Sequence, residues 1–571
     1  MKIFFHKGTN WRWSPTRLDN ESDMLALSFN NWDDYSISTS LNAVLYLGSE
    51  KVLEFSLKLY IEDDKYSPQK LNELRDKGWD GFFPIPNLNY ISVPSDIDFY
   101  SAILGKLSLE KAANVLKITR DASYLINVED DKEALRLSEH PDFVTSALRE
   151  AGARKAFTDG WAFFSPHESK IKDFVLNARK YNGLSEPISF KFNSENLPYD
   201  INLLIGPNGI GKSYTLKSLV EYWLGVESGD IKKLEKLGHV PFDKSPNISK
   251  LILISYSPFE EFTIDLNRAK LQDKDAYKYF GFRQHVEKED GNTRIGISRN
   301  LPARDSIASL MKAFSDDHKF SFMPKWQSKV ETIWSVLQPA IEFDSIGFQL
   351  EKAIEGTEEI PNFPALVVND EDIYLQIDNE VFELMQEWGV NIADSLKFEE
   401  GVIFLKDGAK VKISSGQRLF CYIVLNVVGQ IRNDSLVVID EPELFLHPTL
   451  EIEFISLLKQ VLKAFKSKAI LATHSLAIAR EIPANCIHVY RKHEGQMEVE
   501  HPPFETFGGN VQRISSYVFG DKSVTKPFDE WLEEKMKEDP DAEKLIHELG
   551  DEINEEMTMK ILSLGRKFSG S

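Results

Sequence analysis

The sequence is poor in cysteine and has no surplus of basic residues. Its 2 cysteines, Cys421 and Cys486, each lie inside an apolar run. We therefore expect two buried thiols and neither a disulfide nor a cysteine metal site. Acidic residues outnumber basic ones by 89 to 67, which gives a formal net charge of -22. Such a surface repels nucleic acid and anionic lipid except at a local basic patch, so the charge favours a protein partner or a small anion held locally.

Long apolar runs are missing as well. No run approaches the length of about 18 residues that a membrane-spanning helix needs. The N-terminal stretch MKIFFHKGTNWRWSP has neither an extended apolar region nor a small-residue cleavage site. Internal repeats and low-complexity segments are also absent. These absences predict a cytoplasmic protein without a membrane partner, and an apolar content of 42% supplies cores for two or three domains.

The pattern of apolar residues predicts an α/β protein in three parts. Residues 1–165 mix strand-like and helix-like runs, which predicts an N-terminal mixed α/β domain. Residues 166–530 predict a second α/β domain, interrupted at about 265–400 by an inserted helical lobe without a sustained heptad repeat. Residues 531–571 are strongly charged and predict a tail of surface helices.

A glycine-rich loop follows a short apolar run in the second domain. INLLI, residues 201–205, is typical of a buried parallel strand, and YTLKSLVEYWL after the loop is helix-like. The loop GPNGIGKS matches G-x-x-x-x-G-K-[ST] in full. Backbone N–H groups of such a loop bind phosphates, Lys212 reaches the terminal phosphates, and Ser213 offers a hydroxyl to Mg²⁺. The predicted ATP contacts here are Gly206, Pro207, Asn208, Gly209, Ile210, Gly211, Lys212, Ser213 and Tyr214.

Two later strand-like runs end in polar side chains. SLVVID ends in Asp440 and is followed by Glu441, and KAILAT is followed by His474. Parallel strands deliver such residues to the sheet edge where the glycine loop also lies. We expect Asp440 to join Ser213 at Mg²⁺, Glu441 to take a proton from an attacking water, and His474 to contact the γ-phosphate. Lys212, Glu441 and His474 are thus the predicted catalytic residues of an ATP hydrolase.

A polar stretch, KISSGQRLF at residues 412–420, leads directly into an apolar helix-like segment. A serine at the start of a helix caps it and leaves accessible N–H groups, which makes a second anion site without a lysine. A chain that already has one γ-phosphate site needs a second one only if that site serves a neighbouring molecule. Ser414, Gly416 and Gln417 are therefore predicted to contact nucleotide.

The order of these four motifs resembles that of ATP-binding-cassette (ABC) ATPases, with ISSGQ standing where the family has Leu-Ser-Gly-Gly-Gln. The resemblance covers about residues 185–265 and 400–495. It implies an ABC-type P-loop head with ATP and Mg²⁺ as cofactors. It also implies a homodimer or higher homo-oligomer in which Ser414 of one subunit caps the γ-phosphate held by another.

Two segments narrow the resemblance to particular branches of the ABC ATPases. IDEPELFLHP with LATHS is similar to soluble prokaryotic ATPases of the overcoming-lysogenization-defect and repair lineage, and ETFGGNVQRISSYVFGD resembles a tail of anti-phage ATPases such as those of Septu-type systems. No Asp-x-Asp strand of a Toprim nuclease follows His474, so the resemblance implies a separate effector, for example a nuclease. The family's glutamine loop has no glutamine here, and Ser257 is expected near the metal. The leading hypothesis is an ATPase that switches an effector in anti-phage defence.

Three alternatives stay open. A DNA-repair or chromosome-handling ATPase would clamp DNA and would need a basic face on its closed dimer. A transporter subunit would need a membrane partner, and the long insertion counts against it. An N-terminal nuclease or toxin would have to use Asp33, Asp34, Glu54 and Lys58, whose spacing does not place a carboxylate two residues before the lysine.

Overall fold

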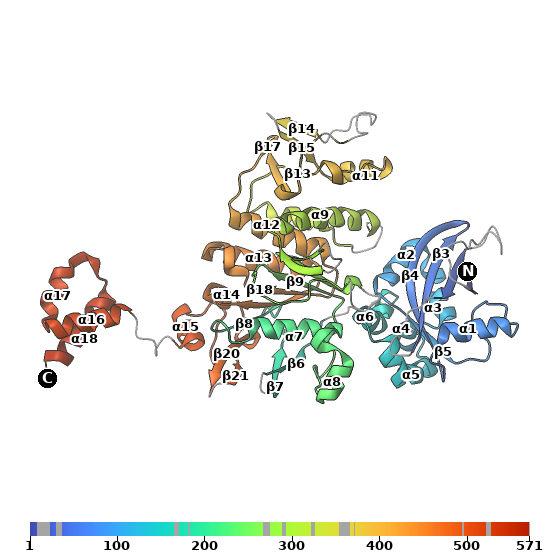
Figure 1. Ribbon diagram of the computed structural model, residues 1–571, viewed down its shortest axis with the longest axis horizontal. Helices are drawn as coiled ribbons and strands as arrows, with labels where there is room; N and C mark the ends of the chain where they lie inside the picture. Colours follow the sequence, from blue (N-terminus) through green and yellow to red (C-terminus); the bar gives the residue numbers. More distant parts are fainter. Residues whose placement is uncertain are drawn as a thin grey trace. The chain divides into compact units, whose positions relative to one another are not determined.

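The computed structural model forms two compact units, residues 1–508 and 509–571 (Figure 1). The residues described are 1–7, 23–29, 37–164, 171–180, 183–266, 274–287, 293–320, 326–352, 354, 366–369, 372–493, 496–520 and 527–569. Asp33 and Asp34 of the nuclease alternative lie outside them. None of the described helices has the length and apolar character needed to cross a membrane. Cys421 and Cys486 are buried and form no disulfide, as expected.

The N-terminal part of the first unit is a mixed α/β domain, as predicted. Its five-stranded sheet has the order β1-β2-β3-β4-β5, with only β1 and β2 parallel. The strands are β1 (Lys2–His6), β2 (Met24–Phe29), β3 (Ser40–Leu47), β4 (Glu50–Ile61) and β5 (Tyr90–Pro94), and the helices are α1 (Ser67–Asp76), α2 (Asp98–Lys106), α3 (Leu109–Thr119), α4 (Ala122–Asn127), α5 (Lys132–Ser138) and α6 (Ala151–Asp159). Lys58 of the nuclease alternative is fully buried beside Glu150, at 3.4 Å, whereas Glu54 pairs with Lys51 at the surface.

A seven-stranded sheet forms the centre of the second domain. Its order is β10-β9-β18-β19-β8-β20-β21, and every neighbouring pair is parallel except β20 with β21. The strands are β8 (Ile201–Ile205), β9 (Lys250–Ser255), β10 (Tyr277–Gly281), β18 (Ser435–Asp440), β19 (Lys468–Thr473), β20 (Ile487–His493) and β21 (Gln496–Glu500). All residues of β8, β9 and β18 are buried, which explains their continuous apolar runs.

Helices cover both faces of this sheet. In Figure 1, α7 lies on one side of the sheet, and α12 and α13 lie on the other. These elements are α7 (Lys212–Leu224), α12 (Ser415–Gln430) and α13 (Pro448–Ala464), with the smaller α8 (Ile231–Leu237), α14 (Leu476–Arg480) and the hairpin of β6 (Phe174–Arg179) and β7 (Ser185–Phe190) around them. The predicted strand, glycine loop and helix are therefore β8, residues 206–211 and α7.

The insertion contains the expected helices and, in addition, a sheet that the sequence did not predict. The helices are α9 (Leu301–Phe320), α10 (Lys329–Leu337) and α11 (Asn379–Glu387). The antiparallel sheet has the order β14 (Leu366–Asn369), β15 (Asp372–Gln376), β13 (Ser345–Leu350), β16 (Val402–Lys406), β17 (Ala409–Lys410). Its strands are short and far apart in the sequence, so their pattern is weak. Helix α9 packs closely on α12 because Gly429 has no side chain: a Cβ there would lie 2.3 Å from the carbonyl oxygen of Ser309.

The second unit is helical. It comprises α15 (Val511–Phe519), α16 (Pro527–Glu538), α17 (Ala542–Leu549) and α18 (Glu555–Ser569). Leu532, Met536 and Ile561 form its small buried core. The unit begins at residue 509, before the strongly charged segment that starts at about 531. The segment 531–571 is helical, with most of α16 and all of α17 and α18 in it.

One buried and one partly exposed set of ion pairs join the N-terminal domain to the loop between α12 and β18. The ammonium group of Lys155, in α6, lies 3.0 Å from a carboxylate oxygen of Asp434 and also pairs with Asp159; its side chain is 1% exposed. In the same loop, the guanidinium of Arg432 donates to Asp96 and Asp98 at 3.0 Å each. The N-terminal domain is thus anchored to the connection between the helix of the ISSGQ motif and the strand that carries Asp440.

Replacing Lys155 by Met should destabilise the first unit. The methionine keeps the volume but leaves the carboxylates of Asp159 and Asp434 buried without their cation, a change that costs about 3–5 kcal/mol in buried pairs. Urea unfolding measures the loss. The exposed pair of Lys117 and Glu129 provides the control, because solvent screens this pair and Lys117→Met should leave the unfolding free energy almost unchanged. Equal effects of the two substitutions would contradict a structural role for Lys155.

Candidate nucleotide-binding and catalytic site

The glycine loop has the backbone geometry that its sequence predicts. Gly211, the residue before α7, has φ of 109°, a conformation that side chains disfavour. A Cβ on Gly206 would lie 2.6 Å from the carbonyl oxygen of Tyr490, so only glycine fits against β20. Pro207, Asn208 and Gly209 are exposed at the tip of the loop, and Ile210 is half-buried. Helix α7, of 13 residues, begins directly after the loop. Its first N–H groups carry the positive end of the helix dipole, which favours a phosphate at the loop.

Lys212 is buried beneath this loop. Its ammonium group donates to the carbonyl oxygens of Gly206 and Pro207, at 2.9 and 3.1 Å, and lies 2.9 Å from Nε2 of His474. Burial lowers the pKa of Lys212 to about 8, while the carboxylates of Glu441 and Asp440 act in the opposite direction. Two of the three predicted catalytic side chains, Lys212 and His474, are therefore in direct contact, although 262 positions separate them.

Ser213 and Asp440, the two predicted metal ligands, are hydrogen-bonded to each other. The hydroxyl of Ser213 donates to Asp440 at 3.0 Å. Asp440 is 3% exposed, and burial raises its pKa to about 7. A cation beside this carboxylate would favour its ionised form. Among the described residues no group of three or more His, Cys, Asp or Glu could hold a metal ion alone, so Mg²⁺ here would need phosphate oxygens and water as further ligands, which is its usual environment.

Glu441 has an unusual backbone conformation that separates its side chain from that of Asp440. Its φ and ψ of 52° and 57° lie in the left-handed region, and its N–H donates to Ala472 at 2.8 Å. Its carboxylate lies 3.7 Å from Nε2 of His474, and this imidazole lowers the pKa of Glu441. The two neighbouring acids thus have opposite pKa shifts, and Glu441 is ionised at neutral pH. An ionised carboxylate is the form that can accept a proton.

The structure adds two acidic residues that the sequence reasoning missed. A carboxylate oxygen of Glu443 accepts the backbone N–H of His474 at 2.6 Å and so fixes the end of β19. Glu260, after β9, accepts a hydrogen bond from Tyr279 at 2.8 Å and acts electrostatically on both Asp440 and Glu441. Glu443 could have been noticed from its position three residues after Asp440. No sequence motif around Glu260 marks that residue.

Ser257 was expected near the metal, but its described contact is local. Its hydroxyl accepts the backbone N–H of Phe259 at 3.4 Å. No described hydrogen bond joins Ser257 to Ser213 or Asp440. In the segment after β9, Glu260 is the residue whose charge reaches the site.

Ser414 caps α12, as predicted. Its hydroxyl accepts the N–H of Gln417 at 3.2 Å, and the side chain of Gln417 accepts the N–H of Ser414 at 3.0 Å. This reciprocal pair is a capping box. Gly416 is buried, and Ser414 and Ser415 are exposed. Lys212, Ser213, Asp440, Glu441 and His474 are called the P-loop cluster below. Among the described residues, no hydrogen bond links the side chains of Ser414 and Gln417 to the P-loop cluster of the same chain.

A cleft of about 420 Å³ opens beside Tyr214, the residue that follows Ser213. Its walls come from α7, α8 and the β6–β7 hairpin, and its lining includes Arg179, Lys217, Tyr222 and His239. The Nε2 atom of His239 is buried there without a hydrogen-bond partner among the described residues. The cleft therefore offers aromatic, cationic and hydrogen-bonding groups next to the predicted phosphate site. Arg179 and His239 were not predicted, since they come from segments remote from the motif.

Residues 201–480 match the model of a protein family described as an AAA domain, putative AbiEii toxin, Type IV TA system. Protein ea59 of Escherichia phage lambda is similar over most of the chain: it is 22% identical over 523 residues, which cover 87% of this chain and 86% of ea59.

The solved structures that match this chain do so with low TM-scores and low sequence identity. The SMC head domain from Thermotoga maritima matches 59% of this chain and 100% of its own, at 12% identity and a TM-score of 0.26. An ATP-binding cassette of an ABC transporter in its ADP conformation matches 61% of this chain and 95% of its own, at 14% identity and a TM-score of 0.25. The strand β8, the P-loop and the helix α7 of the structure lie at the start of residues 201–480, the segment that is similar to the model of an AAA domain.

Proposed function

We propose that the chain hydrolyses ATP with Mg²⁺ and that two copies associate head to tail around the bound ATP. The observation that carries the first part is the gathering of Lys212, Asp440 and Glu441 at the carboxyl edge of one sheet. The buried Ser213–Asp440 pair fits Mg²⁺, which would neutralise phosphate charge when bound. No other cluster in the described residues combines a phosphate loop with an ionised carboxylate.

The side chains have distinct roles in this proposal. Lys212 exchanges the carbonyl oxygens of its own loop for phosphate oxygens, which its position in the loop allows. Glu441, ionised at neutral pH, takes the proton of the water that attacks the γ-phosphate. His474 donates a hydrogen bond to the same phosphate and, through its contact with Glu441, keeps that carboxylate ionised. The backbone N–H bond from His474 to Glu443 holds the imidazole in position.

The head-to-tail arrangement rests on Ser414. Among the residues that the structure describes, its hydroxyl is engaged only in the capping box, and it is exposed at the positive end of a helix of 16 residues. A second copy can present its ATP to this end, so each site would combine the P-loop of one copy with Ser414, Gly416 and Gln417 of the other. Two equivalent sites of this kind are related by a two-fold axis, so the two copies form a closed dimer.

The substitution Glu441→Gln should abolish turnover without abolishing ATP binding. The amide keeps the shape but cannot accept a proton, and loss of a general base costs about 10²–10⁴-fold in rate. Phosphate release and ATP affinity are measured in parallel. Glu453→Gln, an exposed change on α13, is the matched control and should retain the parental rate. Hydrolysis at the parental rate by the Glu441 variant would show that this residue is not the base.

Mixing two inactive variants tests the dimer. Lys212→Ala removes the phosphate lysine and Ser414→Arg blocks the capping end, so each variant alone should be inactive. In a head-to-tail heterodimer one site combines the intact P-loop of one chain with the intact Ser414 of the other. An equal mixture should therefore regain up to about a quarter of the wild-type rate. If the mixture stays inactive, although each variant folds and associates, the two halves of the site do not come from different chains.

We further propose that ATP-driven closure switches a separate effector, such as a nuclease, in conflict between bacteria and phage. The description of the matching family as a putative toxin of a toxin–antitoxin system supports this role, as does the similarity to a phage protein. Bacteria that express the chain with its neighbouring genes should plate phage less efficiently than bacteria with the Glu441→Gln variant. Equal plaque counts over a broad phage panel would contradict the defence role and leave the ATPase proposal untouched.

A further inference from the structure

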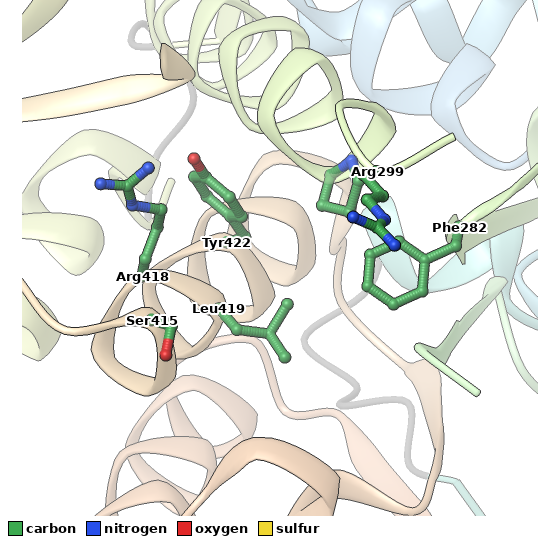
Figure 2. Close-up of a pocket in the computed structure, with 7 residues that line it drawn as sticks. Phe282, Arg299, Ser415, Arg418, Leu419 and Tyr422 are labelled. Carbon is green, nitrogen blue, oxygen red and sulfur yellow. The ribbon is translucent and has the colours of Figure 1, made fainter. Parts of the chain in front are cut away.

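A pocket of about 390 Å³ lies between the N-terminal ends of α9 and α12 (Figure 2). Three segments that are far apart in the sequence form it: the residue after β10, the start of α9, and the first two turns of α12. The lining residues are Phe282, Arg299, Pro302, Ser415, Arg418, Leu419 and Tyr422. None of them belongs to the P-loop cluster, and none was predicted as a site residue.

The charged side chains of the pocket are cationic. Figure 2 shows Arg299 beside Phe282 on one side and Arg418 with Ser415 on the other. Both arginines are exposed, and neither guanidinium has a hydrogen bond or ion pair among the described residues. No carboxylate lines the pocket. On a chain with a net charge of -22, two unpaired guanidinium groups at one small pocket favour an anionic ligand.

The wall between the two arginines is apolar and flat. Leu419 and Tyr422 lie between Arg299 and Arg418 in Figure 2. Tyr422 is 5% exposed, and its hydroxyl points to the carbonyl oxygen of Glu400 at 3.4 Å, so its ring is fixed. The ring of Phe282 packs against that of Tyr256, with centroids 5.4 Å apart. One aromatic ring between the two arginines and a second one beside Arg299 suit a planar base whose phosphates reach the guanidinium groups.

We propose that this pocket binds a nucleotide, with Arg299 and Arg418 as its phosphate contacts. The volume lies near the lower end of the range for small-molecule sites, about 300–1,000 Å³, which favours one nucleotide over a folded acidic peptide. The nucleotide is either free or part of a single strand. The pocket residues lie outside the P-loop, although Ser415 and Arg418 share the first turns of α12 with Ser414; to this extent the inference rests on the proposed head-to-tail dimer.

A nucleotide in this pocket would connect two parts of the chain that are far apart in the sequence. Arg299 precedes α9 of the inserted lobe, whereas Arg418 lies one turn after Ser414 in α12 and its N–H donates to the Ser414 carbonyl at 2.9 Å. A ligand held by both arginines would bridge the inserted lobe and the helix whose first residues are proposed to meet the neighbouring ATP. Occupancy of the pocket is thus placed to influence closure of the dimer.

Binding is tested in the full chain carrying Lys212→Ala, so that the P-loop contributes little. Two fluorescent probes are used at low salt: labelled ADP as the free nucleotide and a labelled oligothymidylate as the single strand. At least one should bind, and Arg299→Glu and Arg418→Glu should each weaken its binding about tenfold or more, as expected for loss of a charge-assisted contact. The matched charge reversal Lys463→Glu, on exposed α13 surface, should leave binding within about twofold.

The two probes separate the sources of the nucleotide. Binding of ADP that depends on both arginines assigns the site to a free nucleotide, and arginine-dependent binding of the oligonucleotide alone assigns it to a single strand. The proposal is overturned if neither probe binds at millimolar concentration. It is also overturned if binding persists unchanged in both arginine variants. Because Lys212 is replaced throughout, these outcomes do not depend on whether the chain hydrolyses ATP.

Discussion

The register of three buried parallel strands places every predicted catalytic group. Asp440 of β18 pairs with Ser255 of β9 and Ala472 of β19, and Thr473 pairs with Ile205 of β8. The strands therefore end at the same level, and the loop after β8, the acids after β18 and the imidazole after β19 meet there. A shift of one strand by one residue would exchange the side chains that pack on its two covered faces and would move the residue at its end by about 3.3 Å, so the same core packing that stabilises the sheet also fixes the site.

The opposite pKa shifts of Asp440 and Glu441 show how neighbouring acids acquire different roles. Asp440 continues the buried strand, so burial raises its pKa to about 7. Glu441 leaves the strand through a left-handed backbone turn, and its carboxylate meets His474, which lowers its pKa. Strained backbone of this kind persists where surrounding structure holds it, here through the hydrogen bond from its N–H to Ala472.

The parts of the site that depend on a few adjacent residues could be predicted from the sequence. The P-loop needs glycine at Gly206 and Gly211, and the cap of α12 needs Ser414 with Gln417, so both could be predicted from a few adjacent residues. Glu260, Arg179 and the sheet of the inserted lobe could not, because their roles arise from packing between segments far apart in the chain. The described hydrogen bond of Ser257 is local, so its expected place near the metal stays a prediction.

Helix α12 begins at the exposed Ser414 cap and ends next to Arg432, which the N-terminal domain holds through Asp96 and Asp98. Its 16 residues span about 24 Å as a stiff rod. Any tilt imposed at one end must appear at the other, with little of it absorbed between. A displacement of the N-terminal domain would therefore act on this end of α12 through Asp96 and Asp98, and the helix would carry it to the Ser414 cap.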